Sequence, residues 1–273
     1  MIVNNLEIFK KYIPSAVYIQ SFEMIEDALQ IAEDWITNNI LSESIRDEFA
    51  EANEAYSLSL LRRAVCTLAF YNIIPDIDLV LTESGFAVAS GEQYSPASRH
   101  RVEKLLESTR KGSRLAIDQL VEYLLRKKDS WRGTEQFANL TAEFILSISE
   151  YELHGGTLDA DADWKSFMLK KPAMRNWIQE KLKPFISDNY LSELLEKIRD
   201  KEKLIEPEER QVLSYIQDAI CMGVSGLQDS AQAKLANALS IMREQPEKFP
   251  TWAASKEAKG YSPDRSNSKI YML

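Results

Sequence analysis

The sequence predicts a mainly α-helical protein, made of a duplicated helical-bundle unit with one small β-hairpin inserted between the copies. Its 273 residues include only nine glycines and nine prolines, fewer turn-forming residues than a many-stranded sheet normally uses. Two stretches, Trp35–Glu43 and Phe185–Glu193, share five identities in nine positions. A second pair follows in the same order, Leu58–Cys66 and Leu213–Cys221, and two collinear matches indicate a duplicated unit.

A helix over residues 22–36 is expected to open the first copy, with an apolar stripe on one side and acidic residues on the other. The stripe consists of Met24, Ile25, Ala28, Leu29, Ala32, Trp35 and Ile36. At an offset of 150 residues it returns in the second copy as Met174, Ile178, Leu182, Phe185 and Ile186. The shared phase predicts that both helices bury the same face.

Asparagine and serine residues mark the expected ends and beginnings of helices in both copies. Asn39 and Asn189 are expected to end their helices, because asparagine tolerates the left-handed conformation that often closes a helix. Ser42 and Ser192 are expected to cap the helices that follow, because a serine hydroxyl can accept a hydrogen bond from a free amide of the first turn.

The next helix of the first copy is expected to reach about residue 72. Its apolar side is formed by Leu58, Leu61, Val65 and Leu68. The counterpart in the second copy carries Leu213, Ile216, Ile220 and Val224. It is delayed by five residues, which we assign to an insertion in the polar loop at residues 200–210. The second half is expected to end with helices over 208–224 and 229–243.

Residues 78–90, between the two copies, carry a β-hairpin signal. Two short apolar runs flank Gly85, and glycine can adopt the positive φ that a tight turn requires. Ser95 and Pro96 then open a long helix, over about residues 96–128, with serine at the cap and proline in the first turn. Another helix is expected over residues 135–149.

The stretch His154–Leu158, which contains two glycines, is the expected internal boundary. It separates an N-terminal helical unit, residues 1–155, from a C-terminal unit, residues 156–250, that repeats the first. Residues 251–273 form a polar tail. Such a tail is either a flexible arm or a strand that adds to another sheet, and the flexible arm is favoured.

The two cysteines and the N-terminal residues indicate the expected compartment. Cys66 and Cys221 lie in apolar helical stretches, which favours buried thiols in a reducing compartment over a disulfide. The N-terminus lacks the pattern of a secretion signal, and the longest apolar run, Ala64–Ile74, is about half of a membrane-spanning helix. We therefore expect a protein that is cytoplasmic when made and has no membrane partner.

The charge distribution disfavours nucleic acid as a partner. The net charge is −9, which would repel a polyanion at long range. Basic residues do gather on the long helix at Arg99, His100, Arg101, Lys104, Arg110, Lys111 and Arg114. Glu103, Glu107 and Asp118 interleave with them as expected ion-pair partners, and stacking aromatics are lacking. A surface that faces solvent or a protein partner is therefore favoured over one that binds nucleic acid.

No motif in the sequence predicts a cofactor, a metal ion or a catalytic group. Asp159, Asp161 and Asp163 imitate the start of a calcium loop, but Trp164 and Lys170 stand where that loop needs glycine and glutamate. We therefore interpret the run as a helix N-terminus. His100 and His154 have no partner at ligand spacing. The expectation is a protein that is not an enzyme, and an enzyme with a site between helices is kept as a third hypothesis.

Two parts of the chain carry a resemblance to phage proteins. Leu79–Ser90 followed by Ser95–Leu105 resembles a segment of uncharacterised prophage-encoded proteins, whose genes lie among virion structural genes. The helix at 22–40, a Leu-Ser-Glu corner and the apolar helix at 58–70 are together similar to the small all-helical head-to-tail connector proteins of tailed phages. Connector proteins usually carry one such unit, so two copies in one chain depart from that pattern.

The resemblance implies a structural or assembly protein of a phage particle, of the head–tail connector or completion type, that works through subunit contacts. It implies self-association, portal or tail components as partners, and location in the virion. The residues expected to make these contacts are Gly85, Phe86, Val88, Arg99, Arg101, Arg110, Arg114, Ile270 and Tyr271. The alternative is a bacterial helical adaptor or regulator that binds proteins and is unrelated to virions.

Overall fold

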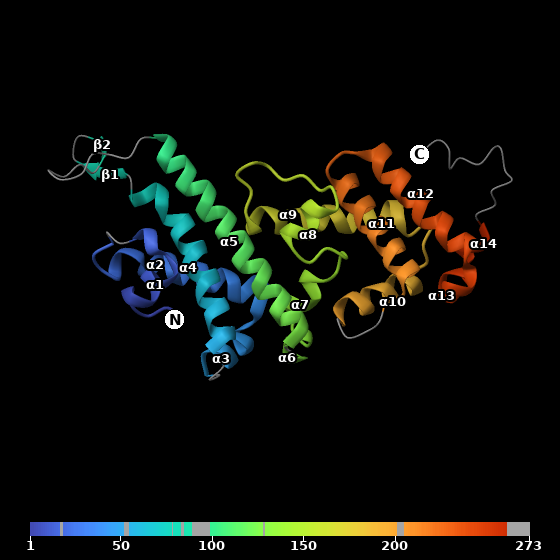
Figure 1. Cartoon of the computed structure of the whole chain (residues 1–273), viewed down its shortest axis with the longest axis horizontal. Coiled ribbons are helices and arrows are strands. Elements are labelled where there is room, and N and C mark those ends of the chain that lie inside the picture. The colour runs from blue at the N-terminus through green and yellow to red at the C-terminus, as the bar shows by residue number, and fades with distance from the viewer. Residues whose placement is uncertain are drawn as a thin grey trace. The chain divides into compact units, whose positions relative to one another are not determined.

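The computed structural model describes most of the chain, namely residues 1–16, 19–51, 55–77, 79–82, 85–88, 99–127, 129–200 and 205–260. The chain is divided into two units, unit 1 with residues Met1–Ala138 and unit 2 from Asn139 onward. Both units are mainly α-helical, as the sequence predicts. Each unit has its own core and is described separately below (Figure 1).

Unit 1 is formed by one series of helices with a short strand pair within it. In chain order its elements are α1 (Leu6–Tyr12), η1 (Pro14–Ala16), α2 (Glu23–Ile36), the π-helix η2 (Thr37–Leu41), α3 (Glu43–Glu51), α4 (Ala55–Ile77), β1 (Leu79–Thr82), β2 (Gly85–Val88), α5 (Arg99–Lys127) and α6 (Asp129–Arg132). Helix α7 (Glu135–Leu140) crosses the division between the units.

Helix α4 is the centre of unit 1, because α2 and α5 both pack against it. Its apolar residues lie all around the helix, as expected for a helix covered on several sides. The buried set includes Leu60, Leu61, Ala64, Val65, Cys66, Leu68, Ala69 and Phe70. Helix α5 runs beside α4 in the opposite direction (Figure 1) and buries its second half there, from Ala116 to Leu125.

The strand pair β1 and β2 lies between α4 and α5 in the chain. The two strands are antiparallel, with Leu79 opposite Val88 and Thr82 opposite Gly85. Their side chains lie outside the described part of the structure. The position of the pair in the sequence is that of the insert expected between the two copies.

Unit 2 repeats the helical character of unit 1. Its elements are α8 (Ile148–Leu153), α9 (Trp164–Trp177), the π-helix η3 (Ile178–Leu182), α10 (Asp188–Arg199), α11 (Pro207–Val224), α12 (Gln228–Glu244), η4 (Pro246–Lys248), α13 (Pro250–Ala253) and α14 (Lys256–Gly260). Helices α11 and α12 form a close pair, and α9 packs against α11. The core is rich in aromatic side chains, such as the edge-to-face pair of Trp164 and Phe167 with ring centroids 5.2 Å apart.

The division between the units lies earlier than the His154–Leu158 stretch that the sequence suggested. Residues after 138 hydrogen bond to side chains of α9 and α11, as when Lys171 binds the carbonyl of Leu140. The expected helix over 135–149 is wrong, because α7 ends at Leu140 and α8 begins at Ile148. Between them Phe144 has a φ of 68°, a left-handed conformation that does not continue an α-helix.

The first pair of matched stretches adopts two different local structures. Asn39 lies in the π-helix η2, where its side chain donates to the carbonyl of Trp35 at 2.8 Å, whereas Asn189 lies in the first turn of α10. The predictions that Asn189 ends a helix and that Ser192 caps the next one are wrong. Ser187 caps α10 instead, with its hydroxyl 3.4 Å from the amide of Tyr190. The correspondence at an offset of 150 therefore does not hold for this pair.

Two expectations about individual residues of the first copy had different outcomes. Ser42 precedes α3 and its hydroxyl accepts from the amide of Ile45 at 3.4 Å, so its expected role as a cap is confirmed. Met24 was placed in the buried stripe of the opening helix, and that prediction is wrong, because 54% of it is exposed. The buried side of α2 is formed by Ile25, Leu29, Ala32 and Ile36.

The second pair of matched stretches is helical in both units. Cys66 lies in α4 and Cys221 in α11, and both thiols are buried and free, as the sequence predicts. Burial raises the pKa of the Cys66 thiol to about 12, so the neutral thiol is the form present near pH 7. Both cysteines are therefore small core residues.

Candidate functional site

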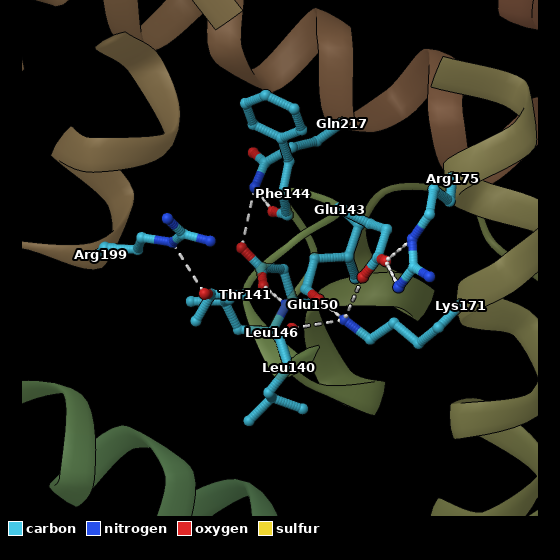
Figure 2. Close-up of polar contacts among 11 residues, drawn as sticks. Leu140, Thr141, Glu143, Phe144, Leu146, Glu150, Lys171, Arg175, Arg199 and Gln217 are labelled. Carbon is cyan, nitrogen blue, oxygen red and sulfur yellow. Dashed lines mark hydrogen bonds and ion pairs between the residues drawn. The ribbon is translucent and has the colours of Figure 1, made fainter. Parts of the chain in front are cut away.

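A network of buried polar contacts surrounds residues 140–146 of unit 2, as Figure 2 shows. Lys171, which projects from α9, is at its centre. Its ammonium group donates to the carbonyl oxygens of Leu140 at 2.7 Å and Ile145 at 2.5 Å, and it lies 3.4 Å from Oε2 of Glu143. Three acceptors use all three protons of an ammonium group, so the arrangement fits the charged form of this lysine.

Arg175 lies one turn after Lys171 on α9 and holds the other oxygen of Glu143. Its Nε and Nη2 atoms donate to Oε1 of Glu143 at 3.0 and 2.6 Å. Glu143 is fully buried, and the two cations compensate for the loss of water around its carboxylate. Burial lowers the pKa of Lys171, whereas the negative charge of Glu143 acts to raise it.

Helix α11 contributes a second set of contacts through Gln217. The side-chain amide of Gln217 donates to the carbonyl of Phe144 and to Oε1 of Glu150, both at 2.9 Å. Oε2 of Glu150 accepts from the amide of Leu146 at 2.6 Å. These bonds hold the backbone at and just after Phe144, whose positive φ is unfavourable by about 1 kcal/mol or more for a residue with a side chain.

Helix α10 completes the network with Arg199, whose Nε donates to the hydroxyl of the buried Thr141 at 2.8 Å. Side chains from α9, α10 and α11 thus all form hydrogen bonds or ion pairs with the segment at residues 140–146 (Figure 2). The charged groups contact backbone groups, neighbouring polar side chains and one another. The arrangement serves to fix the start of unit 2 against its helices.

His154 belongs to a separate polar cluster of unit 2 that no local pattern in the sequence indicated. Its Nδ1 lies 2.7 Å from Oδ1 of Asp218, and the other oxygen of Asp218 accepts from Lys234 at 2.7 Å. His154 is the C-cap of α8, whereas Asp218 lies on α11 and Lys234 on α12. The three residues are far apart in the sequence, so their spacing carries no signal. The cluster joins three helices near the surface.

The metal-like sequence run has a structural role. Asp163 is the N-cap of α9, and its Oδ1 accepts from the amide of Ser166 at 2.9 Å, which confirms the interpretation as a helix N-terminus. Among the described residues, no group of three or more His, Cys, Asp or Glu side chains could hold a metal ion. Nor does that part of the chain contain a helix that is both long and apolar enough to cross a bilayer.

The structure describes the side chains of only some of the expected interface residues. Arg101 is exposed on α5, and Arg110 and Arg114 are half-buried there. Arg99 is the first residue of α5, and Gly85, Phe86 and Val88 belong to β2, but the side chains of these four lie outside the described part of the structure. Ile270 and Tyr271 are also outside the described residues. Of the expected ion pairs on α5, Glu107 and Lys111 form one at 2.6 Å.

Helix α5 is packed along its second half and open along its first half. From His100 to Gly112, a stretch that the structure describes completely, no residue is buried. The apolar stripe nevertheless continues through this part as Val102 and Leu106, which are half-buried. Leu105 and Leu115 are exposed to 37% and 55%. This combination of apolar and basic side chains on an unburied helix is a candidate interaction surface.

Helix α2 presents a second exposed face that the sequence pattern missed. Met24 and Ile31 are exposed to 54% and 57%, and they lie seven residues apart on the same side of the helix. Glu23, Asp27 and Asp34 are exposed beside them. Periodicity placed Met24 in the core because an apolar residue at the edge of a stripe cannot be assigned to one face from sequence alone.

Comparison with known proteins places a similarity in unit 1. Residues 22–139 match the model of a family of unknown function (DUF6712). The match begins just before α2 and ends in α7, so it covers most of unit 1, including both exposed faces. No curated protein and no solved structure matches the chain.

Proposed function

We propose that the chain is a non-enzymatic structural or assembly protein of a phage or prophage particle, of the head–tail connector or completion type. It works through contacts between subunits. The observation that carries the proposal is the first half of α5, where an apolar stripe and several basic residues remain unburied over more than three turns. A helix of this kind is stabilised when a partner covers it.

The resemblance found in the sequence supports the same part of the molecule. The segments Leu79–Ser90 and Ser95–Leu105, which resemble prophage-encoded proteins, include β1, β2 and the first turns of α5. They also lie within the region that matches the family of unknown function. The part of the chain that is similar to other proteins is thus the part that leaves a surface for partners.

We also infer that the two units arose by duplication, in a register anchored on the two π-helices. In unit 1 the order is α2, η2, α3, α4 and α5, and in unit 2 it is α9, η3, α10, α11 and α12. Helices α2 and α9 both have 14 residues and both end in a π-helix of five residues. Short π-helical turns are rare, so two in equivalent places favour a common origin. The strand pair is then an insertion in the first copy.

Tryptophan side chains near the ends of the units support this register. The indole N–H of Trp131 in α6 donates to the carbonyl of Ile40 in η2 at 2.7 Å. In unit 2 the indole N–H of Trp252 in α13 donates to the carbonyl of Phe185, just after η3, at 3.1 Å. Each bond satisfies a carbonyl at or beyond the end of a π-helix.

The proposed function is tested by deleting the gene from its host and examining the particles that are released. We expect heads and tails that fail to join, or particles that stop at one assembly step, with normal particles restored by a copy of the gene. We also expect the chain in purified particles at a fixed copy number relative to the portal protein. Normal, infectious particles without the gene would overturn the proposal and favour a host adaptor.

A further inference from the structure

The exposed face of α2 is acidic and apolar. Met24, Asp27, Ile31 and Asp34 recur at intervals of three and four residues, so they form one stripe along the helix, with Glu23 at its edge. All five are exposed. Asp34 accepts a hydrogen bond from Gln30 of the same helix at 2.7 Å, which leaves its negative charge uncompensated by a cation at that contact. The face therefore offers two apolar side chains beside three carboxylates.

The exposed face of α5 is basic and apolar. Arg101, Lys104, Ser108, Lys111 and Leu115 recur at the same intervals, with Leu105 beside them. Lys111 pairs with Glu107 one turn away, but both side chains are more than half exposed, and a lysine ammonium has three donors to share. The face that α5 buries against α4 lies on another side of the helix. These cations are therefore available to a partner.

The two faces match in spacing as well as in charge. Asp27 and Asp34 are seven residues apart, and so are Lys104 and Lys111. Seven residues of α-helix extend about 10.5 Å, so both pairs of charges can meet at once. When the helices run parallel, Arg101 comes opposite Met24, next to Glu23. Two helices that cross at a small angle keep such a register over two turns.

We infer that α2 of one copy of this chain docks on the first half of α5 of a second copy. The inference rests on the proposed function, since it names the partner of that surface. Met24 and Ile31 cover the apolar side chains of α5, and the charges at the rim fix the register and accelerate association. Because the acidic and basic faces are different surfaces, the contact is heterologous and can repeat from copy to copy.

The partner is a second copy because the chain itself carries both halves of the contact. A nucleic acid would also be attracted to the basic face of α5, but the acidic face of α2 would then have no partner. The net charge of −9 would in addition repel a nucleic acid. A contact of this composition depends on ionic strength. Charges at the rim of the contact attract one another over about one Debye length, which is about 10 Å at 0.1 M salt. At 1 M salt the screening is stronger, and these charges lose much of their effect.

The inference is tested by sedimentation equilibrium of the purified full-length chain and of charge-reversed variants. The acidic-face variant carries Asp27→Lys and Asp34→Lys, and the basic-face variant carries Lys104→Glu and Lys111→Glu. All four side chains are exposed, so circular dichroism should show unchanged helical content. We expect each variant alone to associate at least tenfold more weakly than the natural chain, because two attractive pairs become repulsive.

The doubly reversed chain, which combines the changes of both variants, provides the decisive measurement. In each double variant the α2 face and the α5 face carry charges of the same sign. In the doubly reversed chain, with all four changes, the two faces again carry opposite charges. We expect that chain to regain association to within about threefold of the natural value. A control variant with Lys181→Glu, an exposed lysine of unit 2, should associate normally.

Each outcome has a defined meaning. Association that is unaffected by both double variants, or that is not regained in the doubly reversed chain, overturns the α2–α5 contact and leaves the proposed function standing. A natural chain that stays monomeric at millimolar concentration also overturns the contact. The proposed function fails only in the particle experiment, so the two results can be told apart.

Discussion

The ammonium group of Lys171 lies 3.4 Å from Oε2 of Glu143, and both side chains are buried in unit 2. The pair belongs to the contacts that fix residues 140–146, because Lys171 also binds two backbone carbonyls of that segment. In unit 1 a buried glutamate of α2 has a comparable role. Glu33 accepts from the amide of Ile2 at 2.7 Å and so holds the first residues of the chain. In both units a buried charge fastens the leading segment.

Replacing Lys171 with methionine should destabilise the chain by about 3–5 kcal/mol, because it leaves two carbonyls and one carboxylate oxygen without their cation. The free energy of unfolding in urea measures the loss. Lys170→Met is the matched control, since Lys170 is only half-buried on the same helix, and it should change stability by less than about 1 kcal/mol. Equal effects of the two substitutions would show that the network contributes little.

Stability should fall at alkaline pH because of Cys66. Burial raises the pKa of its thiol from 9.0 to about 12, so between these values the folded chain keeps a proton that the unfolded chain loses. The folded state then binds more protons, and stability decreases by up to about 1.4 kcal/mol for each pH unit above 9.

Urea unfolding at pH 8, 9 and 10 measures this slope. The variant Cys66→Ala should be less stable at every pH, because the core loses a buried sulfur, but its slope should be shallower than that of the natural chain. A thiol reagent added to the folded chain should react with neither cysteine, and both should react after unfolding. An unchanged slope in Cys66→Ala would assign the alkaline loss to other groups.

The helical class was predictable from the sequence because it depends on composition and on periods of three and four residues. Those signals are local, and they also placed α11 and α12 to within one residue at each end. The register of the proposed duplication was not predictable. The Leu-Ser-Glu match lies on two different local structures, because Ser187 caps a new helix in unit 2, whereas unit 1 continues through a π-helix.

The candidate site was predictable only in part. The basic character of α5 follows from its residues, but the exposed side of α2 does not, since Met24 and Ile31 differ from core residues only in what covers them. The hydrogen bonds of Lys171 join residues that are 26 to 31 positions apart in the sequence. Those of Gln217 join residues that are 67 and 73 positions apart. Contacts at such separations depend on tertiary packing and leave no spacing pattern.

Two glycines in long helices should respond to alanine in opposite ways. A Cβ at Gly223 in α11 would lie 2.1 Å from the indole nitrogen of Trp177, whereas a Cβ at Gly112 in α5 would meet nothing within 4 Å. Gly223→Ala should therefore cost about 1–3 kcal/mol or more through overpacking. Gly112→Ala should stabilise by about 0.5–1 kcal/mol, since alanine is the better helix former. Thermal unfolding of both variants gives the comparison, and the same sign for both would contradict it.

The bond from Trp131 to Ile40 should determine the stability of the π-helix η2. Trp131→Phe keeps most of the apolar area but removes the indole N–H, and the buried carbonyl of Ile40 then has one hydrogen bond fewer. The expected loss is about 1–3 kcal/mol. Because the bond acts on η2, hydrogen exchange of the amides of residues 37–42 should accelerate more than that of α4. Trp252→Phe is the matched variant in unit 2, and it should accelerate exchange after η3 while leaving η2 unchanged. Uniform acceleration along the chain in both variants would mean that the two tryptophans stabilise by packing alone, and it would remove one support for the register of the proposed duplication.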